Sequence, residues 1–136
     1  AGWKGTAKGI AAKAVYMMNR EYGSDPEHIM AFIGPGISKC CFETGDDVYA
    51  AFDKGSYSFD IFEEKWDFID DFSVKKGEKY YIDLKGINKK MLMDIGVPEE
   101  NIEVSEHCTC CEPEMFESYR RKGGTYMRMG AGLCLI

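Results

Sequence analysis

The segment 79–105 constrains the fold of this chain more than any other, because it carries the signals of a strand, a helix and a second strand in direct succession. The letters KYYI predict the first strand, since aromatic and β-branched residues favour extended backbone. Asp83 is placed to cap a helix over 84–95, and Gly96 is placed to end it. The letters IEVS after VPEEN predict the second strand. The segment therefore predicts one ordered unit in which a helix connects two strands.

A further helix is predicted over 6–22, where apolar residues recur every three or four positions. These residues are Ala7, Ile10, Ala11, Ala14, Val15, Met18 and Tyr22. Thr6 can cap the start of this helix, and Gly23 suits the left-handed residue just past its end. The letters HIMAFIG over 28–34 then predict a buried strand that leads into a GPG turn.

The middle of the chain carries weaker signals. Thr44, with Asp47 three residues later, resembles a capping box before a short helix that ends at Gly55. Segment 56–79 mixes aromatic and acidic residues without a clean period, which predicts an irregular connection with one strand or helical turn.

The last part of the chain predicts a helical turn followed by a strand. Pro113 can open a turn that runs through Phe116 and Tyr119. The letters YMRMGAGLCLI over 126–136 predict a closing strand that contains glycines.

Composition narrows the class of protein. With 136 residues, of which 45% are hydrophobic and 13% aromatic, the chain can build one core, either as a compact domain or as half of a larger one. A net charge of −6 argues against a general nucleic-acid binder, because phosphate neutralisation needs a basic surface. No apolar run approaches the roughly 20 residues of a membrane span, and the start lacks a signal-peptide core. We therefore expect a cytoplasmic protein without nucleic-acid or membrane partners.

Six cysteines allow three interpretations. They are Cys40, Cys41, Cys108, Cys110, Cys111 and Cys134. Disulfides are disfavoured, because disulfide frameworks belong mostly to small secreted domains that lack a core. A zinc site could use the two-residue gap between Cys108 and Cys111, with Cys40 and Cys41 as the other ligands. Adjacent cysteines point poorly at one metal, so the sequence favours buried free thiols that pack as small hydrophobic groups.

The two histidines do not predict a cysteine nucleophile. His28 lies in a polar turn and is expected at the surface. His107 adjoins Cys108, but neighbours in extended backbone point to opposite faces, so the two do not form a ready dyad.

Three of the four arginines lie close together, at Arg120, Arg121 and Arg128. A turn at Gly123 and Gly124 would fold the last of them back toward the other two. Planar guanidinium groups suit bidentate binding of phosphate or carboxylate, although they could equally form ion pairs with acidic side chains. The letters GWKG and IGPG predict turns whose backbone N–H groups could approach an anion, or turns with no ligand role.

The chain resembles the bacterial laccase-domain family in four successive stretches. They read AGWKGT, IGPGISKCCFETGDDV, YIDLKGINKKMLMDIGVPEENIEVSEHCTCC and FESYRRKGGTYMRMG. The family is also called the multicopper polyphenol oxidase type and is regarded as purine nucleoside phosphorylase-like. The resemblance implies an α+β fold, with a mixed β-core and surrounding helices like that of a bacterial toxin deamidase that has a cysteine and histidine pair.

The resemblance also implies where the metal ligands of the family lie. The family's first motif reads His-Ala-Gly-Trp-Arg-Gly, so its histidine would directly precede Ala1, and a further histidine and cysteine ligand lie upstream. Residues 1–136 would then be the C-terminal part of a single laccase-domain fold, without the N-terminal part that carries the ligands. We expect this part alone to be inactive and to hold no metal or cofactor. The paired cysteines match family positions that are not ligands, which favours packing.

For the intact protein the resemblance implies a zinc-dependent purine nucleoside phosphorylase. Its substrates would be phosphate and adenosine, inosine, guanosine or methylthioadenosine, and it would also deaminate adenosine. An older description of the family is copper-dependent phenol oxidation, as a laccase or polyphenol oxidase. We expect the intact protein to be a cytoplasmic monomer.

Four cations match family positions and are candidates for binding phosphate or shaping the substrate pocket. They are Lys4, Arg120, Arg121 and Arg128. Lys4 stands where the family has arginine, which keeps the charge but loses the bidentate fork. Tyr126 and Met127 replace a smaller Thr-Gly pair before Arg128.

Two alternatives stay open. The first is a non-enzymatic domain whose cysteines hold structural zinc and whose stretch FDIFEEKWDFIDDF binds a partner. The second is a copper phenol oxidase, which is weaker because two histidines cannot build a multi-histidine copper site.

Overall fold

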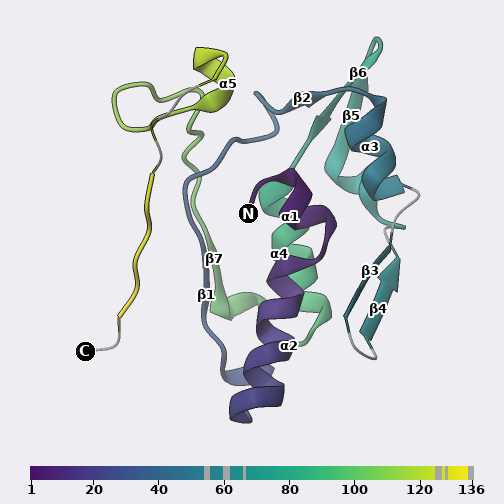
Figure 1. Ribbon diagram of the computed structural model, residues 1–136, viewed down its shortest axis with the longest axis vertical. Coiled ribbons are helices and arrows are strands. Elements are labelled where there is room, and N and C mark those ends of the chain that lie inside the picture. The colour runs from purple at the N-terminus through teal and green to yellow at the C-terminus, as the bar shows by residue number, and fades with distance from the viewer. Residues whose placement is uncertain (54–55, 60–61, 66, 125–126, 128, 135–136) are drawn as a thin grey trace.

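The computed structural model describes residues 1–53, 56–59, 62–65, 67–124, 127 and 129–134. Figure 1 shows helices packed together at the centre, with strands along one flank and further strands on the other. This arrangement confirms the predicted α+β class. The helices are α1 (Trp3–Ala7), α2 (Ile10–Tyr22), α3 (Asp46–Asp53), α4 (Leu84–Asp94) and α5 (Tyr119–Lys122), with 3₁₀ turns η1 (Pro26–His28), η2 (Ile69–Phe72) and η3 (Glu99–Asn101). The strands are β1 (Ala31–Ile33), β2 (Glu43–Thr44), β3 (Ser56–Phe59), β4 (Phe62–Lys65), β5 (Ser73–Lys76), β6 (Lys79–Ile82) and β7 (Ile102–Val104).

The strands of the described residues fall into three small sheets. β1 pairs in parallel with β7, with Ala31 opposite Ile102. β6 lies between β2 and β5 and is antiparallel to both, while β3 and β4 form a separate antiparallel pair. Parallel and antiparallel pairing are thus both present, as a mixed β-core requires.

Helix α4 is the centre of the hydrophobic core, and its prediction is confirmed. The Asp83 side chain accepts a hydrogen bond from the backbone N–H of Gly86 at 3.0 Å, which caps the helix. The apolar face of α4 includes Ile87 and Met91, which are fully buried. A Cβ on Gly86 would lie 2.7 Å from the Phe72 ring, so only glycine lets η2 approach the helix this closely.

The predicted helix 6–22 is two helices instead of one. Gly9 has a φ of 67°, a left-handed conformation that ends α1 and starts α2 in a new direction. Thr6 is therefore not a cap but a fully buried residue of α1, and its hydroxyl accepts a hydrogen bond from Asn88. Gly23 is left-handed just past α2, as predicted.

The predicted strand 28–34 is shorter than expected and less buried. Pro26–His28 forms η1, and the strand β1 covers only Ala31–Ile33. Phe32 is 63% exposed, so β1 is not the fully buried strand that its apolar letters indicate.

Segment 56–79 is more regular than predicted, because β3, β4 and β5 all lie within it. Hydrogen bonding to neighbouring strands stabilises these three strands. Their sequences lack the alternation of apolar and polar residues by which a strand is predicted. Thr44 is in β2 and its hydroxyl donates to the Tyr80 carbonyl, so it does not cap α3. The predicted helix end at Gly55 lies outside the described residues.

The C-terminal predictions are confirmed only in part. Residues 113–115 form a hydrogen-bonded turn, but the helix α5 begins only at Tyr119, where Ser118 caps it. The predicted closing strand 126–136 is not seen in the described part of that segment, residues 127 and 129–134. Among the helices of the described chain, none is both long and apolar enough to cross a membrane.

Candidate functional site

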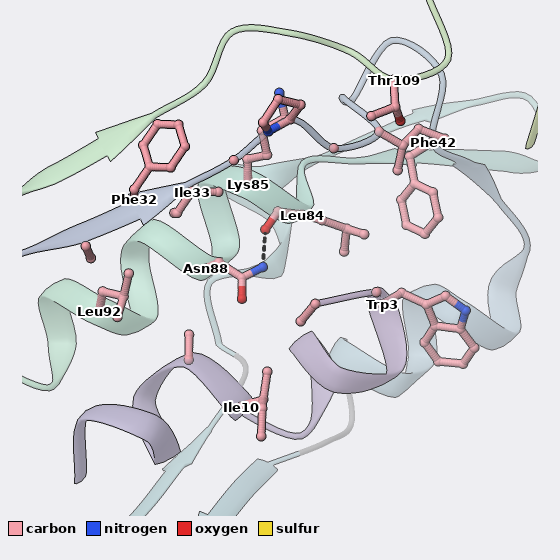
Figure 2. Close-up of a pocket in the computed structure, with 18 of the residues that line it drawn as sticks. Trp3, Ile10, Phe32, Ile33, Phe42, Leu84, Lys85, Asn88, Leu92 and Thr109 are labelled. Atoms are coloured by element: carbon pink, nitrogen blue, oxygen red, sulfur yellow. Dashed lines mark hydrogen bonds between the residues drawn. The ribbon is translucent and has the colours of Figure 1, made fainter. Parts of the chain in front are cut away.

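A pocket of about 1140 Å³ opens between the central helices, β1 and the loops that follow it. Figure 2 shows its wall, with Trp3 and Phe42 at one end and Phe32 near the other. Much of the lining is apolar, which suits a small organic ligand.

Each of the four family-like stretches contributes to this pocket. Residues 1–3, 33–37, 42–45 and 118–120 line it, together with Leu84, Lys85, Asn88, Leu92 and Thr109. These segments come from both ends and the middle of the chain. The fold therefore gathers the motifs around one cavity, which sequence order alone does not reveal.

Two polar residues of α4 form part of the pocket wall. The Nδ2 atom of Asn88 donates to the Thr6 hydroxyl at 3.0 Å and to the Leu84 carbonyl at 2.6 Å. Lys85 is only 9% exposed, and its Nζ atom donates to the carbonyls of Ser105 and His107, both at 2.8 Å. The sequence analysis missed Lys85, although its spacing from the buried Leu92 places it on the inner face of the helix.

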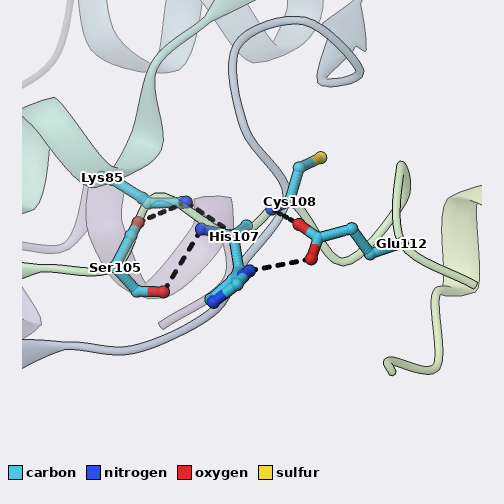
Figure 3. A network of polar contacts seen from close by, with 5 residues as sticks. All are labelled: Lys85, Ser105, His107, Cys108 and Glu112. Carbon is cyan, nitrogen blue, oxygen red and sulfur yellow. Dashed lines mark hydrogen bonds and ion pairs between the residues drawn. The ribbon is translucent and has the colours of Figure 1, made fainter. Parts of the chain in front are cut away.

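The lysine belongs to a polar network on the loop that follows β7 (Figure 3). The His107 Nδ1 atom lies 2.8 Å from Glu112, which lowers the pKa of that carboxyl group. The other Glu112 oxygen accepts the backbone N–H of Cys108 at 2.9 Å. Figure 3 shows the Cys108 sulfur directed away from the His107 ring, so the expectation that they form no dyad is confirmed. His28 is exposed, as predicted.

Four cysteines meet beside the pocket, on two loops that are distant in the sequence. The Sγ atoms of Cys40, Cys41, Cys108 and Cys111 all lie within 4.8 Å of one another. Cys40 and Cys111 are exposed, so the prediction that these thiols pack as buried hydrophobic groups is wrong for them. The six cysteines are free thiols, as the sequence analysis favoured. Four convergent thiols are a set that could bind a metal ion.

The thiols of this cluster differ in acidity. Burial disfavours the Cys108 thiolate, but backbone hydrogen bonds, including one from Ser38 at 3.4 Å, outweigh burial and lower the pKa of this thiol to about 6. A hydrogen bond with Cys111 and burial both raise the pKa of Cys41. The cluster thus presents one readily ionised thiol among its neighbours.

Two of the predicted cations donate hydrogen bonds to the loops that carry the cysteines. Arg120 lines the pocket, and its Nη1 atom donates to the carbonyls of Cys41 and Glu43 at 3.3 and 2.7 Å. The Arg121 guanidinium donates to three carbonyls. These acceptors are Thr109 at 2.7 Å, Cys110 at 3.0 Å and Phe116 at 2.5 Å. Arg120 and Arg121 thus bond to backbone carbonyls and not to the acidic side chains that the sequence left open as an alternative.

The other predicted cations lie elsewhere. Lys4 is exposed on α1, with its Nζ atom 5.6 Å from the centre of the Trp3 ring. Arg128 lies outside the described residues. The GWKG letters belong to the first turn of α1, so the loop predicted there is wrong, whereas IGPG does form the bend after β1. Whether these cations bind substrate stays a prediction.

Comparisons with known proteins give consistent results. The profile of a family described as multi-copper polyphenol oxidoreductase laccase matches residues 1–136. The chain is 39% identical over 129 residues to purine nucleoside phosphorylase YlmD of Bacillus subtilis, covering 95% of this chain and 43% of that protein. It is 38% identical over 125 residues to adenosine deaminase RL5 of an unknown prokaryotic organism, covering 90% of this chain and 44% of that protein.

A solved structure agrees with the sequence comparisons. The crystal structure of the hypothetical protein YfiH from Bacillus licheniformis matches with a TM-score of 0.78 and 39% identity. The match covers 91% of this chain and 43% of that one. The chain thus spans about half the length of the curated relatives that it matches.

Proposed function

The chain belongs to the multi-copper polyphenol oxidoreductase laccase family, and from this premise we propose that the protein carrying it is a purine nucleoside phosphorylase. In the proposed reaction, a phosphate oxygen bonds to C1′ of the ribose while the bond from C1′ to the purine nitrogen breaks. The purine leaves with a proton and ribose 1-phosphate is the other product. Adenosine, inosine, guanosine and methylthioadenosine are the proposed substrates, and adenosine deamination is a proposed second activity.

The observation that carries the proposal is the convergence of the four family-like stretches on one pocket. A purine is flat and largely apolar on its faces, and the pocket offers Trp3, Phe42 and Leu84 for packing. Relatives named purine nucleoside phosphorylase and adenosine deaminase both support a purine nucleoside as the ligand.

Arg120 is the residue that we propose for phosphate. It lines the pocket, and two backbone carbonyls hold its Nη1 atom in place. A guanidinium that is fixed in this way loses little conformational freedom when it binds an anion, which favours bidentate recognition. Lys4, Arg121 and Arg128 remain proposed contributors to the same site.

The zinc that the family resemblance implies would need histidine and cysteine ligands, and the pocket lining among the described residues contains neither. The pocket of this chain therefore does not fit a catalytic zinc by itself, and we derive no step through the metal. Copper-dependent phenol oxidation has even less support, because the one candidate set of metal ligands among the described residues consists of cysteines alone.

The direct experiment incubates the full-length protein with adenosine in the presence and absence of phosphate, followed by chromatography. We expect adenine and ribose 1-phosphate only when phosphate is present. Inosine formed without phosphate would report the deaminase activity. If phosphate produced no free base from any of the four nucleosides, the phosphorylase proposal would be wrong.

A pair of arginine variants tests the role of Arg120. Arg120→Gln should raise the KM for phosphate about 10- to 100-fold, because a charged hydrogen bond contributes about 1.5–3 kcal/mol. The KM for the nucleoside should change much less. Arg20→Gln, on exposed α2 surface beside Glu21, is the matched control and should leave both values unchanged. An equal loss of affinity for both substrates in Arg120→Gln would indicate a structural role instead.

A further inference from the structure

We propose that Cys40, Cys41, Cys108 and Cys111 bind one structural Zn²⁺ ion that fastens two loops beside the pocket. This site is separate from the phosphorylase proposal, because none of the four cysteines lines the pocket.

The sulfur atoms are spaced as a tetrahedral zinc site requires. A Zn–S bond of about 2.3 Å in a tetrahedron places neighbouring sulfurs about 3.8 Å apart. Cys40 Sγ lies 3.7 Å from Cys41 Sγ, 3.9 Å from Cys108 Sγ and 3.7 Å from Cys111 Sγ. Cys41 Sγ and Cys111 Sγ are 3.3 Å apart. Four of the six sulfur–sulfur edges thus lie within about half an ångström of the expected value, and all six are within 4.8 Å.

Each cysteine pair lies in a tight turn, which removes the objection that adjacent cysteines cannot share a metal. The backbone N–H groups of Cys41 and Phe42 both donate to the Ser38 carbonyl at 3.0 Å. The N–H groups of Cys111 and Glu112 likewise donate to the Cys108 carbonyl, at 3.1 and 3.2 Å. Neighbouring side chains point to opposite faces only in a strand, so these turns can direct both thiols of a pair to one point.

The surroundings suit a zinc tetrathiolate in hydrogen bonding and charge. The backbone N–H of Ser38 donates to Cys108 Sγ at 3.4 Å, a contact of the kind that supports metal-bound sulfur. One Zn²⁺ with four thiolates carries a net charge of −2. The guanidinium groups of Arg120 and Arg121 donate to carbonyls of Cys41 and Cys110. These two positive charges near the cluster would offset part of that charge, even with the Glu112 carboxylate close to Cys108.

A site with four protein sulfurs leaves no position open for substrate or water, which is the property of a structural zinc site. The two loops already touch, since Gly36 forms a parallel bridge with Cys108. Phe42 and Thr109, which directly follow Cys41 and Cys108, line the pocket. The metal would therefore fix one wall of the pocket without taking part in the reaction.

The test measures bound metal in the full-length protein and in two variants. Cys40→Ser/Cys111→Ser removes the two exposed ligands, and Cys110→Ser removes a thiol that lies between ligands in the chain but outside the cluster. We expect the double variant to hold one zinc per chain less than the wild type, and Cys110→Ser to lose none. Equal zinc in the wild type and the double variant would overturn the proposal, and iron in place of zinc would overturn the metal assignment.

Cobalt substitution gives a second readout that needs no variant to fold. The wild-type protein loaded with Co²⁺ should show the intense charge-transfer and d–d absorption of tetrahedral tetrathiolate cobalt. Charge transfer no stronger than one cysteine ligand gives would overturn the site, because the metal site that the family resemblance implies has one cysteine of its own. Neither measurement involves nucleoside turnover, so failure of the zinc proposal and failure of the phosphorylase proposal are distinguishable.

Discussion

The α4 core and the cysteine loops are held together in different ways. In the α4 core, apolar side chains such as Ile82, Ile87 and Met91 have no exposed surface, and burial supplies the stabilisation. The cysteine loops, defined as residues 34–44 and 105–118, contain little regular structure. Ile37 and Phe42 of these loops pack against the α4 core, and charged side chains from α4 and α5 bind the remainder by donating to backbone carbonyls.

The pocket therefore has one wall held mainly by apolar packing and another wall in which polar links to the backbone dominate. Leu84 and Leu92 reach it from the helix, whereas Phe42 and Thr109 reach it from the cysteine loops. A wall built on packing resists local change, while a wall built on a few polar links can open when one link is removed. The substitutions below test this distinction, from the largest expected effect to the smallest.

The largest effect is expected in the α4 core. Ile87→Ala should lower the free energy of unfolding by about 3–4 kcal/mol, because it removes buried methyl groups and leaves a cavity. Val74→Ala on β5, where Val74 is 42% exposed, is the control and should cost less than about 1 kcal/mol. Denaturant unfolding measures both. A loss in Ile87→Ala no larger than that of the control would contradict the packing account.

Lys85→Met tests the link between the two regions. The substitution keeps the side-chain stem but leaves the carbonyls of Ser105 and His107 without their donor. We expect a loss of about 2–3 kcal/mol, with amide exchange rising in the cysteine loops before it rises in α4. The exposed Lys13→Met serves as the control. Equal loss of protection in α4 and in the loops would show that the two regions are one cooperative unit.

Arg121→Lys is expected to have a smaller and more local effect. Lysine keeps the charge but cannot reach all three carbonyls that the planar guanidinium contacts. The free energy of unfolding should fall by about 1–2 kcal/mol, and exchange should increase in residues 108–118. Arg20→Lys on α2 should change neither quantity. Unaltered exchange in Arg121→Lys would mean that these bonds do not hold the loop.

The smallest effect concerns a polar contact at the edge of the α4 core. The Tyr49 hydroxyl donates to Asp70 at 2.6 Å, and this hydrogen bond is the main cause that raises the pKa of Tyr49 to about 12. The contribution to stability should be complete below about pH 10, the pKa of unfolded tyrosine, and decline toward pH 12. Tyr49→Phe should cost about 1 kcal/mol at pH 7 and remove this decline. An unchanged pH profile in the variant would contradict the assignment.

The α4 core was predictable because its signals are local. Asp83, the apolar period of the helix and the flanking strands all lie within the segment 79–105, and the structure keeps each of them. The errors near this core have local causes too. Gly9 adopts a left-handed conformation that divides the helix expected over 6–22, and apolar spacing continues across that break.

The cysteine loops were not predictable in the same way. Cys40 and Cys108 are 68 residues apart in the chain, and no spacing rule indicates that their sulfur atoms lie 3.9 Å apart. The bonds of Arg120 to Cys41 and Glu43 likewise span more than 70 residues. The family-like motifs identified which segments matter, but only the fold shows that they surround one pocket.

The most direct test of this account is amide hydrogen exchange on the full-length protein before and after zinc is removed with a chelator. We predict that exchange increases in the cysteine loops, residues 34–44 and 105–118, while α4 keeps its protection, because packing holds the helix independently of the metal. Unchanged exchange in these loops, or equal loss of protection in α4, would contradict the claim that polar links and a metal hold one wall of the pocket and packing holds the other.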